Sequence, residues 1–471
     1  MKTFLQPLQN LAEMEEIQKQ AKKNRGILEI SGCMESQKAH LMYGLSGLFP
    51  CHLVIAADEK SAKELYEDYR FYDKRVYYYP AKDLLFFQAD IHGNLLIRQR
   101  MQVIRALLER EDEITVVTSI DGCMDYLAPL EKIEKQLIHF RNDSTLDMDK
   151  LTAALVHMGY ERVGQVEMPG QFSIRGGIID IYSLTEENPW RIELWGDEID
   201  SIRSFDAQSQ RSLENLDDVT IYPAAEQPME KNGVSFLDYF KETETLFFLD
   251  ELNHLEENAK AVQEEFQQSC ENRKEKGEIS LSGDWMCTWE ELCHKINDRN
   301  CVAMSLLDPK KSNWKISDQF NITVKSMSSY QSSFELLVKD LKQYKKEGYQ
   351  IVLLSGSRTR AERLAKDLQE EGLNAFYGQD SDRILQPGEI MVAYGHARRG
   401  FEYPLVKFAV ITETDIFGKE QKKRKKKKEY NGKRIQDFSE LSIGDYVVHE
   451  KHGLGIYKGI EKVAVDKVAK D

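Results

Sequence analysis

The chain has 471 residues, of which 41% are hydrophobic and 30% charged, enough apolar material for about three globular domains of roughly 150 residues each. No apolar run approaches the roughly 18 residues that a membrane-spanning helix needs, and the N-terminus lacks a signal-peptide pattern, so we expect a cytoplasmic protein with no membrane interaction. The net charge of −15 is uneven: residues 419–434 carry ten Lys or Arg and two Glu, a net of +8, which leaves −23 on the remainder.

Residues 27–118 alternate short apolar runs with amphipathic segments. This alternation is typical of βαβ units, in which helices cover both faces of a parallel sheet, so we predict an α/β domain. The predicted strands are Ile27–Ile30, Leu53–Ala57, Val76–Tyr79 and Ile114–Thr118, and the predicted helices are Ser36–Leu48, Glu59–Tyr72 and Asn94–Arg110.

The loop after the first predicted strand lies where a P-loop would bind phosphate. A P-loop reads G-x-x-x-x-G-K-[ST], and here Gly32 and Lys38 keep their positions. Gln37 replaces the second glycine, Ala39 replaces the hydroxyl that would bind Mg²⁺, and Glu35 adds a negative charge. We therefore interpret this loop as a relict P-loop with a solvated lysine, and we predict no cofactor for this chain.

Residues 120–150 are predicted to form a connector, and a β-rich module follows between Gly159 and Ala224. Its apolar runs alternate with Gly, Pro and Asn turn residues, a pattern that predicts antiparallel hairpins with an arginine-bearing exposed face. Asp197–Asp200 superficially matches a helicase DExD motif, but the preceding Gly196 predicts a hairpin turn there. The predicted strands are Phe172–Ile174, Ile178–Tyr182, Arg191–Trp195 and Ile199–Phe205, and the arginines predicted to be exposed are Arg162, Arg175, Arg191 and Arg203.

Residues 225–330 are expected to complete the first α/β domain, because a chain that leaves a domain for an inserted module must return to it. The predicted strands are Thr245–Leu249, Cys301–Leu306 and Ile322–Val324, and Asn253–Gln268 is predicted to be a helix. Cys287, Cys293, His294 and Cys301 are close in sequence, but without a C-x-x-C pair we interpret them as reduced structural thiols and predict no metal site.

Residues 331–417 predict a second α/β unit. The loop that starts at Ser355 joins a strand to a helix, and we expect Ser357 to cap that helix. The predicted helices are Phe334–Glu347 and Ser357–Gly372, and the predicted strands are Gln350–Leu354, Asn374–Tyr377, Ile390–Tyr394 and Lys407–Thr412.

The basic run after this unit predicts an extended linker that doubles as a nucleic-acid or acidic-partner tether. Its central residues are Lys422, Lys423, Arg424, Lys425, Lys426, Lys427 and Lys428. Residues 441–471 then read as the first strands of a small β-barrel. His449 and His452 have no third ligand nearby, so we predict strand and turn roles for them.

Several of these stretches together resemble the N-terminal half of the bacterial transcription-repair coupling factors (Mfd). The most specific is the β-rich module, which resembles the domain that this family shares with the excision-repair protein UvrB. The other matching stretches are Tyr79-Pro-Ala-Lys-Asp, Arg98-Gln-Arg, Ile411-Thr-Glu-Thr-Asp-Ile-Phe-Gly, and Gly444-Asp-Tyr-Val-Val-His with His452-Gly-Leu-Gly.

The resemblance implies an architecture and a fold for each part. Residues 1–145 with 225–310 would form a UvrB-like, RecA-like α/β domain with a degenerate nucleotide site, and 146–224 a UvrA-binding β-rich domain. Residues 331–417 would form the family's third domain, followed by a basic linker at 418–440. Residues 441–471 would begin the domain that binds RNA polymerase.

The resemblance also implies partners. UvrA would bind Arg162 and Arg175, with Tyr182 nearby, and the RNA polymerase β subunit would bind the C-terminal segment. The family's ATP- and Mg²⁺-dependent DNA translocase motor would follow residue 471, so we expect an excised fragment or a truncated product, monomeric, with weak DNA binding at most. Two alternatives stay open: a nucleotide-binding helicase-type lobe that uses Lys38, and a nonspecific DNA binder that uses the basic run.

Overall fold

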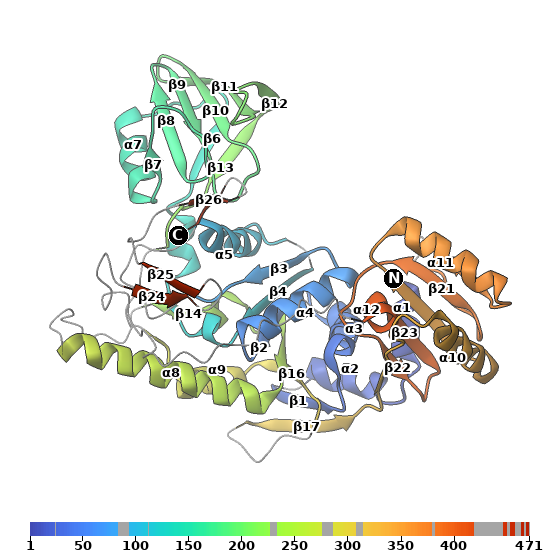
Figure 1. Ribbon diagram of the computed structural model, residues 1–471. Coiled ribbons are helices and arrows are strands. Elements are labelled where there is room, and N and C mark those ends of the chain that lie inside the picture. Colours follow the sequence, from blue (N-terminus) through green and yellow to red (C-terminus); the bar gives the residue numbers. More distant parts are fainter. Residues whose placement is uncertain are drawn as a thin grey trace.

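A computed structural model describes residues 1–23, 25–82, 94–111, 113–226, 233–275, 286–307, 314–378, 382–418, 446–449, 453–456, 463–465 and 468–470. These residues form three main units with separate sheets (Figure 1). The basic run at 422–428 lies outside the described residues.

The first unit is a seven-stranded parallel sheet in the order β17-β1-β16-β15-β2-β4-β3. Successive side chains of its inner strands enter different cores: Leu53 and Ile55 pack in one hydrophobic cluster, and Val54 and Ala56 in another. Both faces are therefore covered, which explains why these strands are almost continuously apolar. The strands are β1 (Gly26–Ser31), β2 (Cys51–Ala56), β3 (Val76–Tyr79), β4 (Ile114–Ser119), β15 (Thr245–Asp250), β16 (Asn300–Ser305) and β17 (Ile316–Asn321).

Strands β15 and β16 lie between β1 and β2, so the chain after the β-rich module completes the sheet that precedes it, as predicted. The sheet also continues past residue 310 to β17. The predicted strand at Ile322–Val324 is wrong, because the edge strand β17 ends at Asn321. The helices and short elements of this unit are α1 (Lys2–Gln9), α2 (Met14–Lys23), α3 (Glu35–Leu45), η1 (Ser46–Leu48), α4 (Glu59–Tyr72), α5 (Asn94–Leu108), η3 (Asp121–Cys123), β5 (Tyr126–Leu127), α6 (Leu130–Glu134), β14 (Val234–Ser235), η4 (Phe236–Tyr239), α8 (Leu252–Glu275) and α9 (Trp289–Asn297).

The β-rich unit projects from the first unit beside α5 (Figure 1). Its six-stranded sheet has the order β12-β11-β10-β9-β8-β7, and the predicted hairpins are confirmed. Gly196 has a φ of +66° in the turn that contains Asp197, so the DExD-like segment is a hairpin rather than the end of a buried parallel strand. The elements are β7 (Glu161–Arg162), β8 (Gln171–Arg175), β9 (Ile178–Ile181), β10 (Trp190–Trp195), β11 (Glu198–Phe205) and β12 (Ser212–Leu216), with α7 (Met148–His157) against β7.

A separate two-stranded antiparallel ribbon connects this unit to the first unit. β6 (Ile138–Arg141) pairs antiparallel with β13 (Asp218–Ile221), so the entering and leaving chain segments lie side by side. The prediction of a plain connector over residues 120–150 is therefore wrong: this stretch also contains α6 and the start of α7.

The third unit is a six-stranded sheet in the order β18-β22-β23-β19-β21-β20. Strands β19, β20, β21 and β23 run parallel to one another, whereas at one edge the short strand β22 pairs antiparallel with both β23 and β18. The elements are β18 (Lys325–Ser326), α10 (Phe334–Glu347), β19 (Gln350–Ser355), α11 (Arg358–Glu370), β20 (Ala375–Tyr377), β21 (Ile390–Tyr394), β22 (Phe401–Tyr403), β23 (Phe408–Thr412) and α12 (Glu413–Phe417). Ser357 is the N-cap residue of α11, but its side chain accepts no capping hydrogen bond, so the predicted capping role is wrong.

The C-terminal segment contains the two predicted strands, β24 (Tyr446–His449) and β25 (Gly453–Ile456), which form an antiparallel pair. A second pair, β26 (Val463–Val465) and β27 (Val468–Lys470), follows. Within the described parts of the chain, no helix is both long and apolar enough to cross a membrane.

Candidate partner-binding groove and relict nucleotide site

Lys38 lies at the relict P-loop, and it is buried. Its Nζ lies 2.6 Å from Asp250 Oδ1 and 2.6 Å from Glu251 Oε1. Burial alone would lower the pKa of Lys38. The two carboxylates raise this pKa by more than burial lowers it, so the pKa is raised overall and the lysine is charged. The prediction of a solvated lysine is therefore wrong: its charge is neutralised within the protein.

Asp250 and Glu251 lie at the carboxyl end of β15, a buried parallel strand of the same sheet. This is where a nucleotide-binding α/β fold places the acids that hold its metal ion. The sequence analysis identified the strand Thr245–Leu249, but did not pair the two acids that follow it with Lys38. The available signal was a fully apolar run, Leu246–Leu249, followed directly by Asp-Glu.

Other segments of the protein also pack closely against the loop and helix around Lys38. Gly32 has a φ of +80°, and a Cβ there would lie 2.2 Å from the carbonyl oxygen of Ile322. The Gln37 side chain accepts a hydrogen bond from the Met34 N–H at 3.1 Å and donates one to the Tyr403 hydroxyl at 2.9 Å. A glycine at position 37 would lose this link to the third unit.

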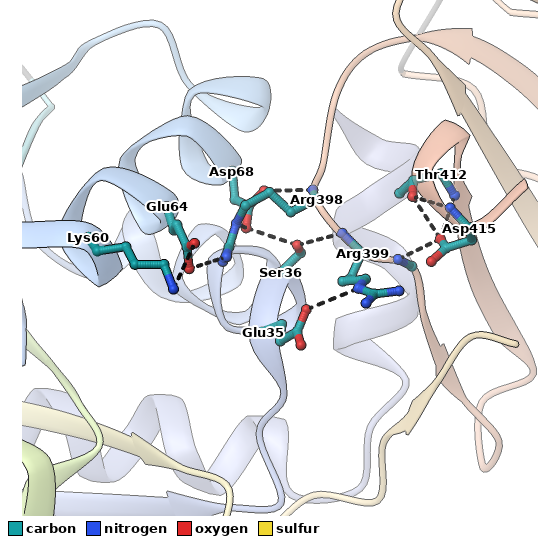
Figure 2. A network of polar contacts seen from close by, with 10 residues as sticks. Glu35, Ser36, Lys60, Glu64, Asp68, Arg398, Arg399, Thr412 and Asp415 are labelled. Carbon is teal, nitrogen blue, oxygen red and sulfur yellow. Dashed lines mark hydrogen bonds and ion pairs between the residues drawn. The ribbon is translucent and has the colours of Figure 1, made fainter. Parts of the chain in front are cut away.

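A polar network covers the N-terminal end of α3, where a P-loop would hold phosphate (Figure 2). Ser36 Oγ donates to Asp68 Oδ2 at 2.8 Å and accepts from the Arg399 N–H at 3.1 Å. Arg398 donates its backbone N–H and its Nε to the two Asp68 oxygens, each at 2.9 Å, and it also pairs with Glu64. The arginine-bearing loop of the third unit thus contacts the first turn of this helix, beside a cavity of about 230 Å³ that Glu35, Ser36 and Arg399 help to line.

The β-rich unit has an open groove of its own, remote from Lys38. The groove has a volume of about 650 Å³ and lies between α7 and the strands β7 and β8. Arg162 and Ile174 line one side, and α7 lines the other with Thr152 and Val156. Val156 is 56% exposed, so the groove combines apolar surface with one cationic and one acidic side chain, Arg162 and Asp149.

The other arginines predicted on this face are held by neighbouring acids. Asp180 is buried, and it accepts hydrogen bonds from both Arg175 and Arg191, with Arg175 Nη2 at 2.6 Å. Arg203 pairs with Glu193. Arg175 stays 46% exposed, whereas the Arg191 side chain is only 14% exposed, so the prediction of an exposed Arg191 is wrong.

Tyr182 lies in the interior of the β-rich unit. It is 2% exposed, and its hydroxyl donates to the Glu187 carbonyl at 2.5 Å. Burial raises its pKa, so the hydroxyl stays protonated. A direct partner contact by Tyr182 is therefore contradicted, and the residue supports the sheet from behind.

The three cysteines that are close in sequence between residues 287 and 301 are buried in the protein. Cys287 and Cys301 are buried and unpaired, and burial raises the pKa of both thiols. Among the residues with described positions, no three His, Cys, Asp or Glu side chains gather as a metal site would require.

Comparison with known proteins connects two of these regions to characterised families. Residues 138–226 match the model of the UvrB interaction domain, and residues 441–471 match that of the CarD-like/TRCF RID domain. The first match begins with β6 and includes the whole β-rich unit with its groove.

The chain as a whole is similar to longer proteins. It is 31% identical over 518 positions to the transcription-repair-coupling factor of Bacillus subtilis (strain 168), covering 94% of this chain and 44% of that protein. It is 27% identical over 455 positions to the protein of the same name from Staphylococcus haemolyticus, covering 84% and 38%. The chain thus spans less than half the length of these relatives. A DEAD box protein from Methanococcus jannaschii aligns over 84% of this chain and 78% of its own, at 9% identity and a TM-score of 0.27, too low a similarity to bear on the fold. Together the two domain matches and the similarity along nearly the whole chain show that it belongs to the transcription-repair coupling factors and corresponds to their N-terminal region.

Proposed function

We propose that this chain recruits the excision-repair protein UvrA through the β-rich unit, as part of a protein that couples repair to a stalled RNA polymerase. The observation that carries the proposal is the open groove beside Arg162, inside the stretch that matches the UvrB interaction domain. The RNA polymerase β subunit would bind through residues 441–471, which match the CarD-like/TRCF RID domain. In the complete protein, an ATP-dependent motor would displace the polymerase.

The groove has the chemistry of a protein-binding site. Arg162 is exposed at its rim and can form charge-assisted, bidentate hydrogen bonds with a partner carboxylate. Val156 and Ile174 supply apolar surface that a partner would cover. Arg175 follows Ile174 on β8, and its contact with Asp180 fixes its guanidinium at the surface. We therefore place the contact on α7, β7 and the end of β8.

The proposal is tested by UvrA capture with the variant Arg162→Glu/Arg175→Glu. We expect a loss of binding of at least about 100-fold, because each reversed charge would face an acidic partner surface. Arg211→Glu is the matched control, since Arg211 is also exposed but precedes β12 at the opposite edge of the same sheet. Arg211→Glu should unfold at the wild-type temperature, whereas the double variant should unfold at a lower one, because Arg175 is one of the two arginines that pair with the buried Asp180; capture is therefore measured well below that temperature. UvrA capture that is unchanged in the double variant would refute the assignment.

A further inference from the structure

A second cavity lies between the first and third units, far from the groove on α7. Its volume is about 650 Å³. Its walls come from α1 and α4 of the first unit and from the carboxyl ends of β19, β20 and β21 of the third, near the N-terminus in Figure 1. Ligands of open α/β sheets bind outside the carboxyl ends of the strands, so this is a favourable location for a site.

One close contact fixes the shape of the cavity. Gly395 follows β21, and its N–H donates to the Ser355 carbonyl at the end of β19. A Cβ at this position would lie 2.1 Å from the ring of Phe71 on α4. Only a glycine therefore lets the first unit approach this end of the third unit's sheet.

The charged groups at the cavity are mostly basic. Arg70 comes from α4, Lys74 from the segment just after it, and Arg358 from the first turn of α11, against the single carboxylate of Glu67. Among the described residues, neither Arg70 nor Arg358 forms an ion pair. By contrast, the neighbouring Arg360 is paired with Glu413 at 3.1 Å. The N-terminal turn of α11 contains no acidic residue, so its positive end adds to this potential.

An exposed aromatic residue completes the site. Tyr394 ends β21 and is 54% exposed, and the Arg358 guanidinium lies 5.5 Å from the centre of its ring. An aromatic face beside basic side chains is the arrangement by which proteins bind single strands: the base stacks and the phosphates pair with the cations. An acidic peptide would use the basic groups but has no need of the exposed ring.

We propose that this cavity binds single-stranded nucleic acid, with a base stacked on Tyr394 and the phosphates held by Arg70, Lys74 and Arg358. The cavity is concave and lies between two units, so it admits a single strand more readily than a rigid duplex. This site is separate from the UvrA groove and does not depend on the function proposed for that groove.

The test measures fluorescence anisotropy of labelled oligo(dT) with the whole chain. The basic run at 422–428 would bind the same probe, so all variants are made in a chain whose residues 422–428 are replaced by serine. We expect Arg358→Glu to weaken binding at least tenfold and to reduce the slope of log affinity against log salt by about 0.7 for each phosphate that is no longer neutralised. Tyr394→Ala should weaken binding by at least about fivefold, as the loss of one stacked base implies.

Lys346→Glu is the matched control, because Lys346 is an exposed residue at the C-terminal end of α10, at the opposite end of the third unit's sheet. It should bind as the parent chain does. Equal effects of Arg358→Glu and Lys346→Glu would overturn the proposal, as would the absence of oligo(dT) binding by the parent. Equal binding of a duplex would show nonspecific electrostatics, and competition by dTMP as effective as that by the oligomer would show a mononucleotide pocket. Either result also overturns it. Tyr394→Ala removes no charge, so it decides the question if Arg358→Glu fails to fold.

Discussion

At the scale of single residues, Lys38 shows how a lysine at the position of a P-loop lysine can be paired within the protein. Position 38 still holds the lysine of a P-loop, and Asp250 and Glu251 still end the strand that faces it. In an active site a phosphate and a metal ion separate the lysine from such acids. Here the groups contact each other directly, and the ion pair takes the place that a ligand would need.

Lys38→Met should destabilise the first unit by about 3 kcal/mol, because it leaves buried carboxylates unpaired. The double variant Lys38→Met/Asp250→Asn should recover a large part of the loss. The measurement is amide hydrogen exchange of α3 and β15, which reports the local opening free energy. Calorimetric titration of the wild-type chain with Mg-ATP should show no binding at this site. Micromolar affinity that is lost in Lys38→Met would contradict this view.

A second buried ion pair holds the segment that returns from the β-rich unit against the first unit. Arg100 is fully buried, and its Nε lies 2.6 Å from Glu226 Oε1, while Asp125 contacts its Nη2 at 3.0 Å. Lys82 adds a further contact to Glu226 at 2.5 Å. Burial raises the pKa of Glu226, but Arg100 and Lys82 outweigh it and lower the pKa to about 2, from an ordinary value of 4.5.

The sign of this shift predicts a pH dependence. A carboxyl group whose folded pKa is depressed contributes stability above its unfolded pKa, and that contribution disappears as the pH falls from 4.5 through 2. Its full value is on the order of 3 kcal/mol. The difference in unfolding free energy between wild type and Glu226→Gln should therefore be largest at pH 7 and shrink below pH 4.5. The exposed Glu167→Gln serves as control, and a difference that stays constant between pH 7 and pH 3 would disprove the assignment.

At the scale of elements, the loop before β22 holds the third unit to α3 and α4. Its two arginines lie in different environments. Arg398 pairs with Asp68, which is fully buried, whereas Arg399 lies 3.6 Å from the exposed Glu35. Buried pairs cost several kcal/mol when one partner is removed, whereas surface pairs contribute about 0–1 kcal/mol.

Arg398→Ala should therefore loosen the junction by about 3 kcal/mol, and Arg399→Ala by less than about 1 kcal/mol. Hydrogen exchange in α4 and β22 should increase in the first variant and hardly change in the second. Small-angle X-ray scattering should show a more extended particle only for Arg398→Ala. Equal behaviour of the two variants would mean that the ion pair with Asp68 does not hold the units together.

The sequence predicts the longer elements well and the short ones poorly. Glu59–Tyr72 and Phe334–Glu347 match α4 and α10 residue for residue, because apolar periodicity extends over several turns. The two-residue strands β7 and β18 have too few residues for a period, and their existence depends on the partner strand. β6 was missed for the same reason: its partner β13 follows it by some 80 residues.

Site residues follow a similar division. The exposure of Arg162 was predicted. It follows from the sequence because Arg162 is a charged residue next to an apolar strand. The burial of Lys38 could not be predicted, because it depends on two acids more than 200 residues away along the chain. The burial of Tyr182 likewise depends on Val166 and Ala207, which pack against it from other segments.

At the scale of the whole molecule, the groove and the cavity proposed here as binding sites are two separate surfaces. The groove on α7 faces outward on the projecting β-rich unit, and the cavity at Tyr394 lies between the other two units. No described residue lines both. Substitutions at one surface should therefore leave binding at the other unchanged, and the charge variants proposed above can be combined without interference.

The strand order of the first unit has a consequence for synthesis of the chain on the ribosome. β1 and β2 are separated in the sheet by β16 and β15, which are encoded some 200 residues later. At about 5–20 residues per second, the nascent chain carries β1 without either sheet neighbour, and β2 with β4 on one side only, for roughly 10–50 s. The β-rich unit emerges complete within that interval. It can fold first, while the apolar strands β1 and β2 lack the partners that β15 and β16 provide until those strands leave the exit tunnel.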